Sequence, residues 1–295
     1  MVPLKSGLLP ATHDRSFDFS HAKTFGATVD MLPGLPPLGL GRKPMPVTDQ
    51  KNTSDCTGFS TALASSFQEN VPLAPEFQVA AVSAVVGQPI TYVGAQPIDA
   101  MKAATQFGSL EDAGKPYDFA IQGWNIPADM RNYTDAEKTA ALVHRKQSYF
   151  AVTTDSGMDM YDAIRLALWQ SRDENGVVCA FSPWYREFNT PIKGIVPLPA
   201  QPFVSRHAYT YIDWTVIDGK EYLVSQLTQG PGFGDNGLLY FDRATVNFVW
   251  SDMYHTGSCL YLFRDIDPAD PNIVPVGFDW VNWIRSFLAH HGIQV

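Results

Sequence analysis

The pattern of apolar and polar positions divides the chain into a helical first part and a strand-rich second part. Residues 56–69 carry apolar side chains at the spacing of one helical face, which predicts a helix with Ser54 or Asp55 as its N-cap. That face consists of Phe59, Ala62, Leu63 and Phe67. The same periodicity predicts further helices over residues 75–86, 97–107, 135–147 and 158–170.

After residue 176 the pattern becomes typical of strands that alternate with turns. Val, Ile, Tyr, Phe and Thr, which favour strands, dominate the segments between the turn residues. Asp218-Gly219 is a hairpin signal. The predicted strands cover residues 176–182, 206–217, 220–226, 237–242 and 257–263. The fold class expected from this order of elements is α+β.

The sequence predicts four segments along the chain, namely an arm, two lobes and a tail. Residues 1–48 form an arm rich in Pro and Gly, which excludes regular helix or central strand. A mainly helical lobe is expected over residues 49–150 and a mainly β lobe over residues 151–265. The tail, residues 266–295, has helical periodicity around residues 280–290. That helix either packs on its own body or docks a partner protein.

Composition and charge narrow the class of protein. The chain has 295 residues and a formal net charge of −9, which argues against general binding of nucleic acid or of anionic membranes. No apolar run approaches the ~20 residues of a membrane span, and the N-terminus lacks the pattern of a secretory signal. Three cysteines are too few for a disulfide framework and favour a reducing compartment, so we expect a cytoplasmic protein. The sequence shows no cluster with metal-ligand spacing, so no cofactor is expected.

Cys56 is the residue most suited to nucleophilic chemistry, because it stands at the predicted start of a helix. The backbone N–H groups and dipole of a helix start favour thiolate, the nucleophilic form of cysteine. The side-chain amide of Gln50 and the backbone N–H of Cys56 are candidate donors to an oxyanion. Cys179 and Cys259 lie in strand-like apolar runs and are interpreted as buried, inert thiols.

A cysteine nucleophile needs an imidazole partner, and His207 is the best candidate among the seven histidines. It begins a predicted strand far downstream of Cys56, as in papain-type enzymes. The hairpin at Asp218 brings the strand that ends at Gln226 back beside it. Gln226 is therefore a candidate for orienting the ring of His207.

Several segments together resemble the papain-like cysteine peptidases. PVTDQKNTSDCTGFSTALA resembles the nucleophile segment of that family, and YVGAQPIDAMKAATQFGSLEDAGKPYD resembles its Gly-Gly segment. RHAYTYIDW resembles the histidine strand, and EYLVSQLTQGPGFGDNGLLYF resembles the asparagine strand with its following turn. The resemblance runs in the family's order from about residue 46 to residue 245. It implies a two-lobed papain-like fold, with a helical left lobe, an antiparallel β-barrel right lobe and an active site in the cleft between them.

The resemblance also implies roles for individual residues. Cys56 would be the nucleophile, His207 its base and acid, and Gln50 an oxyanion donor. The backbone of Gly94 and Ala95 would pair with an extended peptide or protein substrate.

The chain departs from the family's pattern around the histidine. Arg206 precedes His207, where a cation would favour thiolate, and it counts among the expected substrate-binding residues. Leu227 stands at the position of the family's histidine-orienting asparagine, unless one inserted residue in LTQG gives that position to Gln226. The family has a tryptophan that shields the histidine and its orienting residue, and Thr228 stands at that position here.

Three functions are compatible with these residues. The first is a cysteine peptidase that hydrolyses peptide bonds through Cys56 and His207. The second is a weak or inert papain-like fold that serves as a structural or peptide-binding component of a larger assembly, such as a virus or phage particle. The third, less favoured, is a transglutaminase-like or amidase relative with the same Cys–His pair. GLLPATHDRSFDF in the arm resembles family members without a long propeptide, so we expect the arm not to block the cleft.

Overall fold

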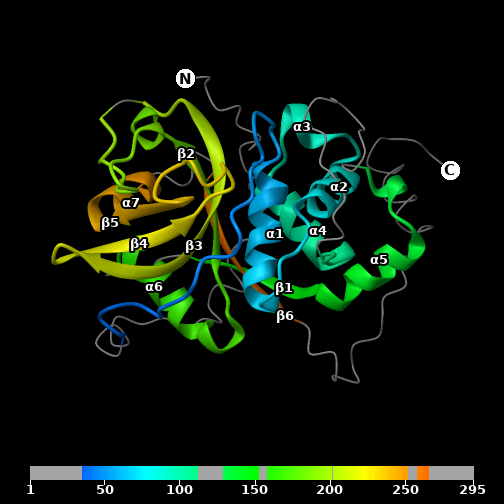
Figure 1. Cartoon of the computed structure of the whole chain (residues 1–295), viewed down its shortest axis with the longest axis horizontal. Coiled ribbons are helices and arrows are strands. Elements are labelled where there is room, and N and C mark those ends of the chain that lie inside the picture. Colours follow the sequence, from blue (N-terminus) through cyan, green and yellow to red (C-terminus); the bar gives the residue numbers. More distant parts are fainter. Residues whose placement is uncertain (1–34, 112–128, 153–157, 201, 252–257, 266–295) are drawn as a thin grey trace. The chain divides into compact units, whose positions relative to one another are not determined.

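The computed structural model describes residues 35–111, 129–152, 158–200, 202–251 and 258–265 (Figure 1). The chain divides into one large compact unit, Met1–Asp265, and a second unit, Ile266–Val295. The helix expected around residues 280–290, with its proposed docking role, lies outside the described residues, as do residues 1–34 of the arm. Among the described residues, no helix combines the length and the apolar character that crossing a membrane requires.

Most predicted helices are present, with small shifts at their ends. The helices are α1 (Cys56–Glu69), α2 (Pro75–Val86), α3 (Ile90–Val93), α4 (Pro97–Phe107), α5 (Asp135–Ala141), α6 (Met160–Gln170) and α7 (Arg243–Trp250). The helix expected over residues 135–147 ends at Ala141, because the chain continues in a 3₁₀ turn and then enters a strand. The sequence pattern did not predict α3 or α7.

The described strands form one six-stranded sheet in which every pairing is antiparallel. They are β1 (Lys146–Ala151), β2 (Val178–Trp184), β3 (Ser205–Ile217), β4 (Lys220–Gln226), β5 (Leu238–Asp242) and β6 (Cys259–Asp265). Their order across the sheet is β1-β6-β2-β3-β4-β5. The predicted hairpin joins β3 to β4, and both Asp218 and Gly219 have the positive φ of such a turn. The α+β class is confirmed.

Helix α1 is buried on all sides. Figure 1 shows it between the strands and the other helices of the first half of the chain. Every residue from Cys56 to Gln68 is buried, so the protein covers the polar positions of the helix as well as its apolar face. At Gly58 a Cβ atom would lie 2.7 Å from Val79 Cγ2, which shows how closely α1 and α2 approach. The buried hydroxyl of Thr61 donates to the carbonyl of Thr57 (2.8 Å), as polar side chains in a covered helix require.

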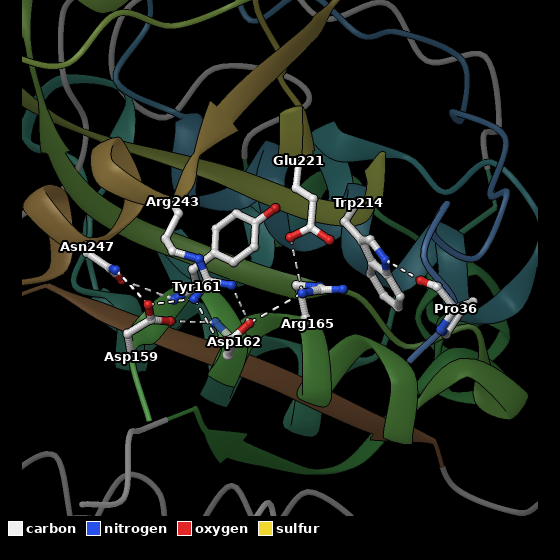
Figure 2. A network of polar contacts seen from close by, with 9 residues as sticks. All are labelled: Pro36, Asp159, Tyr161, Asp162, Arg165, Trp214, Glu221, Arg243 and Asn247. Carbon is white, nitrogen blue, oxygen red and sulfur yellow. Dashed lines mark hydrogen bonds and ion pairs between the residues drawn. The ribbon is translucent and has the colours of Figure 1, made fainter. Parts of the chain in front are cut away.

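A network of charged side chains fastens α6 to the elements that follow it (Figure 2). Arg243, the first residue of α7, donates two hydrogen bonds to the carboxylate of Asp162 (2.7 and 2.9 Å) and one to Asp159 (2.6 Å). Arg165 lies 3.4 Å from Asp162 and 3.5 Å from Glu221 of β4. Paired and hydrogen-bonded charges of this kind fix the relative position of elements.

Hydrogen bonds between the backbone of the arm and side chains of β3 attach the described part of the arm to the body. The carboxylate of Asp213 accepts from the N–H groups of Leu40 (2.7 Å) and Arg42 (2.8 Å). The indole of Trp214 donates to the carbonyl of Pro36 (2.9 Å), a contact that Figure 2 also shows. Gly39 lies so close to β3 that a Cβ atom would be 1.9 Å from the carbonyl oxygen of Trp214. The arm therefore packs against the body at these residues.

Two glycines of the arm give a matched test of this packing. Gly39 and Gly41 both have positive φ, so alanine costs about 1–2 kcal/mol of backbone strain at either position. No atom lies within 4 Å of a Cβ at Gly41, whereas Gly39 faces the Trp214 carbonyl. We expect Gly39→Ala to lower the free energy of unfolding in urea by at least about 1 kcal/mol more than Gly41→Ala. Equal losses would show that the arm does not depend on this close approach.

Candidate active site

Cys56 is the first residue of α1, as the sequence predicted. Asp55 is the N-cap residue, and its carbonyl accepts from the N–H of Phe59 (3.1 Å). Because the first N–H groups of a helix have no acceptor within it, the N–H of Cys56 points out of the helix start. The helix dipole at this end favours negative charge on the sulfur. The side chain of Cys56 is fully buried (0% exposed).

Gln50 is fixed by contacts with Thr228, the residue that lies two positions beyond β4. Its backbone N–H donates to the Thr228 carbonyl (2.8 Å), and its side-chain oxygen accepts from the Thr228 hydroxyl (2.6 Å). The amide nitrogen of Gln50 donates to the carbonyl of Thr53 (3.2 Å), which uses one of its two hydrogens. The oxygen end of the side chain is thus anchored on Thr228, and the nitrogen end faces the loop that leads to Cys56.

His207 lies near the start of β3 and is 2% exposed. Its backbone pairs with Ser182 of β2, and its ring packs against Trp184, with ring centroids 4.8 Å apart and planes at 71°. Burial lowers the pKa of His207 to about 3, since a dry site disfavours the charged ring. Among the described residues, nothing hydrogen-bonds to its Nε2 atom, although that atom is buried.

The contacts of α1 with the sheet show which end of the sheet Cys56 approaches. Ser60 and Thr210 of β3 form a hydrogen bond between their hydroxyls (3.0 Å). At the far end of α1, the Gln68 amide donates to the carbonyl of Phe263 in β6 (2.7 Å). Phe263 belongs to the end of the sheet where Val178 pairs with Leu262, remote from the start of β3.

The opposite end of α1 therefore points toward the start of β3. The hydroxyls of Ser60 and Thr210 mark where α1 crosses β3. Cys56 lies one helical turn to the N-terminal side of Ser60, and His207 lies three residues to the N-terminal side of Thr210. This common direction is the one that a pairing of Cys56 with His207 requires, and the pairing itself stays a prediction.

The structure contradicts the expectation that Gln226 orients His207. The side-chain oxygen of Gln226 accepts from the N–H of Met45 (3.0 Å), and its nitrogen donates to the Met45 carbonyl (2.8 Å). Gln226 pairs with Thr210 in the ladder and Leu227 continues by donating its N–H to the Gly237 carbonyl (2.9 Å), so the bulge that was to turn Gln226 toward His207 is not found at these residues. The physical reason is that a side-chain amide pairs with both polar groups of one backbone residue. Leu227 is fully buried and has no polar side-chain atom to offer.

The other expected substrate-binding residues have identifiable positions but untested roles. Gly94 caps the short helix α3, and its N–H donates to the carbonyl of Ile90 (2.7 Å). Its neighbour Ala95 is fully buried. The guanidinium of Arg206 lies 5.2 Å from the ring centre of Phe203. The proposed pairing of Gly94 and Ala95 with a substrate, and a role of Arg206 beside His207, stay predictions.

The sequence did not predict the contacts of two residues in this region, Trp184 and Thr228. Trp184 contacts His207, yet the only signal for it was its place at the end of a strand-like run. Thr228 was interpreted as the replacement of a shielding tryptophan, whereas its hydroxyl and carbonyl both bind Gln50. A hydroxyl residue two positions after the end of a predicted strand was the available signal. Within the described parts of the chain, no group of His, Cys, Asp and Glu could hold a metal ion.

Comparison with solved structures finds cysteine proteases of several organisms. Xylellain, a cysteine protease from Xylella fastidiosa, is similar with a TM-score of 0.68 and 18% identity, over 90% of this chain and 98% of xylellain. Procathepsin B S9 from Trypanosoma congolense is similar with a TM-score of 0.55 and 14% identity, over 86% of this chain and 85% of that protein.

A plant enzyme gives a third comparison. The Carica candamarcensis cysteine protease CMS1MS2, in complex with E-64, has a TM-score of 0.52 and 15% identity, over 75% of this chain and 94% of that one. The sequence matches no family model and no curated protein sequence. At these identities the likeness concerns the fold.

The burial of His207 predicts a dependence of stability on pH. An unfolded histidine has a pKa of about 6.5, so between about pH 3 and 6.5 the unfolded chain binds a proton that the folded site rejects. Stability therefore falls as the pH falls through this range. We expect His207→Gln to remove part of that loss in urea unfolding curves recorded from pH 7 to pH 4.

His144 provides the matched control for this measurement. The pKa of His144 is raised, chiefly by its hydrogen bond to Glu69, so its contribution is present below about pH 6.5 and is lost as the pH rises. His144→Gln should therefore cost more stability at low pH, the opposite trend. An unchanged acid profile in His207→Gln would show that His207 is hydrated in the folded protein.

Proposed function

We propose that this chain, whose fold is that of the papain-like cysteine proteases, is a peptidase that cleaves peptide bonds through Cys56 and His207. The observation that carries the proposal is the start of α1, where Cys56 is the first residue and where Thr228 anchors the amide of Gln50 toward the loop that leads to this helix start. A helix start and a fixed amide are suited to a thiolate and to the oxyanion that forms when it attacks a carbonyl.

The reaction begins with attack of the Cys56 sulfur on the scissile carbonyl carbon. The carbonyl oxygen then carries negative charge, and the N–H of Cys56 with the second amide hydrogen of Gln50 are its donors in this proposal. Thr228 acts through Gln50, because its hydroxyl holds the amide oxygen and so fixes where the amide nitrogen points.

His207 moves the proton in both halves of the reaction. Because burial keeps the imidazole neutral at pH 7, we expect it to take the proton of the Cys56 thiol as the sulfur attacks. The imidazolium then gives that proton to the leaving amine, and the C–N bond breaks to leave a thioester on Cys56. In the second half, His207 takes a proton from water as the water oxygen bonds to the thioester carbon. The C–S bond then breaks to release the carboxylic acid product, and the imidazolium returns its proton to the Cys56 sulfur.

Burial sets a condition on this reaction. Cys56 is 0% exposed and His207 is 2% exposed, so a substrate has to displace whatever covers the sulfur before attack. Opening of a closed site on the microsecond to millisecond scale is common among enzymes. We therefore expect slow reaction with large reagents compared with small ones.

A second candidate function is a papain-like fold that binds peptides or supports a larger assembly, such as a virus or phage particle, without efficient catalysis. The observation that favours it is the absence, among the described residues, of a hydrogen-bond acceptor for His207 Nε2. An acyl transferase or amidase with the same Cys–His pair is the remaining outcome of the tests below.

Cleavage of an unbiased peptide library tests the proposed function. We expect the full chain to cleave peptides and Cys56→Ser to lower the rate by about a thousandfold or more. Cys179→Ser is the matched control and should retain the rate, because Cys179 lies in β2 and takes no part in the proposed reaction. Transfer or side-chain deamidation without backbone cleavage would identify the third function. No Cys56-dependent reaction at all would favour the second.

Brief alkylation gives an independent readout of the nucleophile. Cys179 is buried as predicted, whereas Cys259 is of intermediate exposure. Desolvation raises the pKa of Cys179 to about 12 and that of Cys259 above its ordinary range, which disfavours thiolate at neutral pH. Peptide mapping after treatment with iodoacetamide should find Cys56 labelled first. Equal labelling of all three thiols would contradict selective activation of Cys56.

The anchoring of Gln50 predicts a mild and specific defect. Thr228→Val keeps the shape of the side chain but removes the hydroxyl that donates to Gln50. We expect kcat to fall about tenfold to a hundredfold, because the oxyanion donor is no longer held in place. Thr228→Ser, which retains the hydroxyl, should stay near the wild-type value. Equal activity of both variants would remove Gln50 from the mechanism.

A further inference from the structure

Within the described parts of the chain, the buried Nε2 atom of His207 has no hydrogen-bond partner. In a Cys–His pair one ring nitrogen faces the sulfur, and the other is ordinarily fixed by an acceptor that sets the ring's orientation. The candidates for that acceptor are engaged elsewhere or apolar: Gln226 binds Met45, and Leu227 has no polar side-chain atom. Some other contact has to orient the imidazole if His207 is to act on Cys56.

Trp184 makes that contact. Its ring centroid lies 4.8 Å from that of His207, and the planes cross at 71°, close to the edge-to-face arrangement that aromatic rings favour. The indole is fully buried (0% exposed) and comes from β2, where it lies two residues beyond Ser182, the backbone partner of His207. Adjacent strands therefore hold both rings at a fixed separation.

Trp184 is itself fixed from several sides. Its indole N–H donates to the side-chain oxygen of Asn189 (2.9 Å). Its ring meets Phe188 edge to face at 5.3 Å and lies 6.4 Å from Phe233. Its backbone carbonyl accepts from the N–H of Val204 (2.8 Å). A side chain with this many contacts has little rotational freedom, so it can restrict that of its neighbour.

We propose that Trp184 is the positioning residue of His207, and that it orients the imidazole by packing instead of by a hydrogen bond. This inference rests on the proposed function, in which His207 transfers protons to and from Cys56. Trp184 touches neither sulfur nor substrate in this account and acts only through His207. It also keeps water from the buried nitrogen, which is the condition under which the ring stays neutral.

The inference predicts linked changes when the indole is shortened. Trp184→Leu keeps an apolar side chain but opens space beside the imidazole, so water reaches Nε2 and the charged ring becomes less unfavourable. The pKa of His207 should then rise by at least one unit toward the ordinary value of about 6.5. The ring also gains rotational freedom, so kcat should fall about tenfold to a hundredfold, whereas KM stays within about twofold.

Two further variants should change kcat and the pKa of His207 less than Trp184→Leu does, and a third serves as a control. Trp184→Phe retains an aromatic edge and should rescue most of the loss in kcat. Asn189→Ala leaves the indole in place but removes the acceptor of its N–H, so it should give an intermediate titration of His207. Trp169→Leu is the matched control, since this tryptophan of α6 lies beside Arg172 (4.0 Å from the guanidinium carbon to the ring centre). It should leave kcat and the titration of His207 unchanged.

The experiment combines peptide-cleavage kinetics with NMR of ¹⁵N-histidine-labelled full chain, with His207→Gln used to assign its resonances. A raised pKa together with a fall in kcat in Trp184→Leu supports the inference. A folded Trp184→Leu with the wild-type titration and kcat overturns it. If Trp184→Leu does not fold, Trp184→Phe and Asn189→Ala decide by the same two readouts.

The two readouts also separate this inference from the proposed function. If the wild-type chain shows no Cys56-dependent cleavage, the proposed function fails. The claim that Trp184 supports catalysis by orienting His207 then fails with it. The pKa of His207 still decides whether Trp184 holds the ring: a raised pKa in Trp184→Leu supports that part, and an unchanged pKa overturns it.

Discussion

The complete burial of α1 is the constraint on which the rest of the structure depends. A helix covered on all sides must carry small side chains where its neighbours approach, as Gly58 does against Val79. The hydroxyl pair of Ser60 and Thr210 joins the helix to the sheet and satisfies a buried polar group of α1 within the protein. Among the described residues, the buried hydroxyls of Thr57 and Ser65 have no such partner. Because α1 is held in this way, its start has one position relative to β3.

The candidate site is a consequence of that position. Cys56 is placed by the start of the helix, His207 by the start of the strand, and Gln50 by Thr228, so each functional group is set by an element or a residue outside the reaction itself. The packing of Trp184 on His207 adds an aromatic contact where a polar one was expected. Burial of the same ring explains both its low pKa and its demand for a tightly packed neighbour.

Local sequence patterns predicted the parts of the fold that depend on local physics. The limits of α1, α2 and α4, the hairpin at Asp218 and Gly219, and the order of the later strands follow from periodicity, capping and turn residues. Covering of α1 on every side, by contrast, depends on elements distant in sequence. The partner of Gln226 also depends on a distant segment, because Met45 belongs to the arm. A local sequence pattern does not predict where the arm lies. The pairing of α1 with β3 thus needed the structure.

The central claim is that Cys56 forms a covalent intermediate whose formation needs His207. The most direct measurement is intact-mass analysis of the full chain, quenched in acid within seconds of mixing with an excess of an activated peptide ester. The account predicts an acyl adduct that maps to Cys56, disappears on hydrolysis in the wild type and is strongly reduced in His207→Gln. An adduct of equal yield in both proteins, or one distributed over Cys56, Cys179 and Cys259, would contradict it.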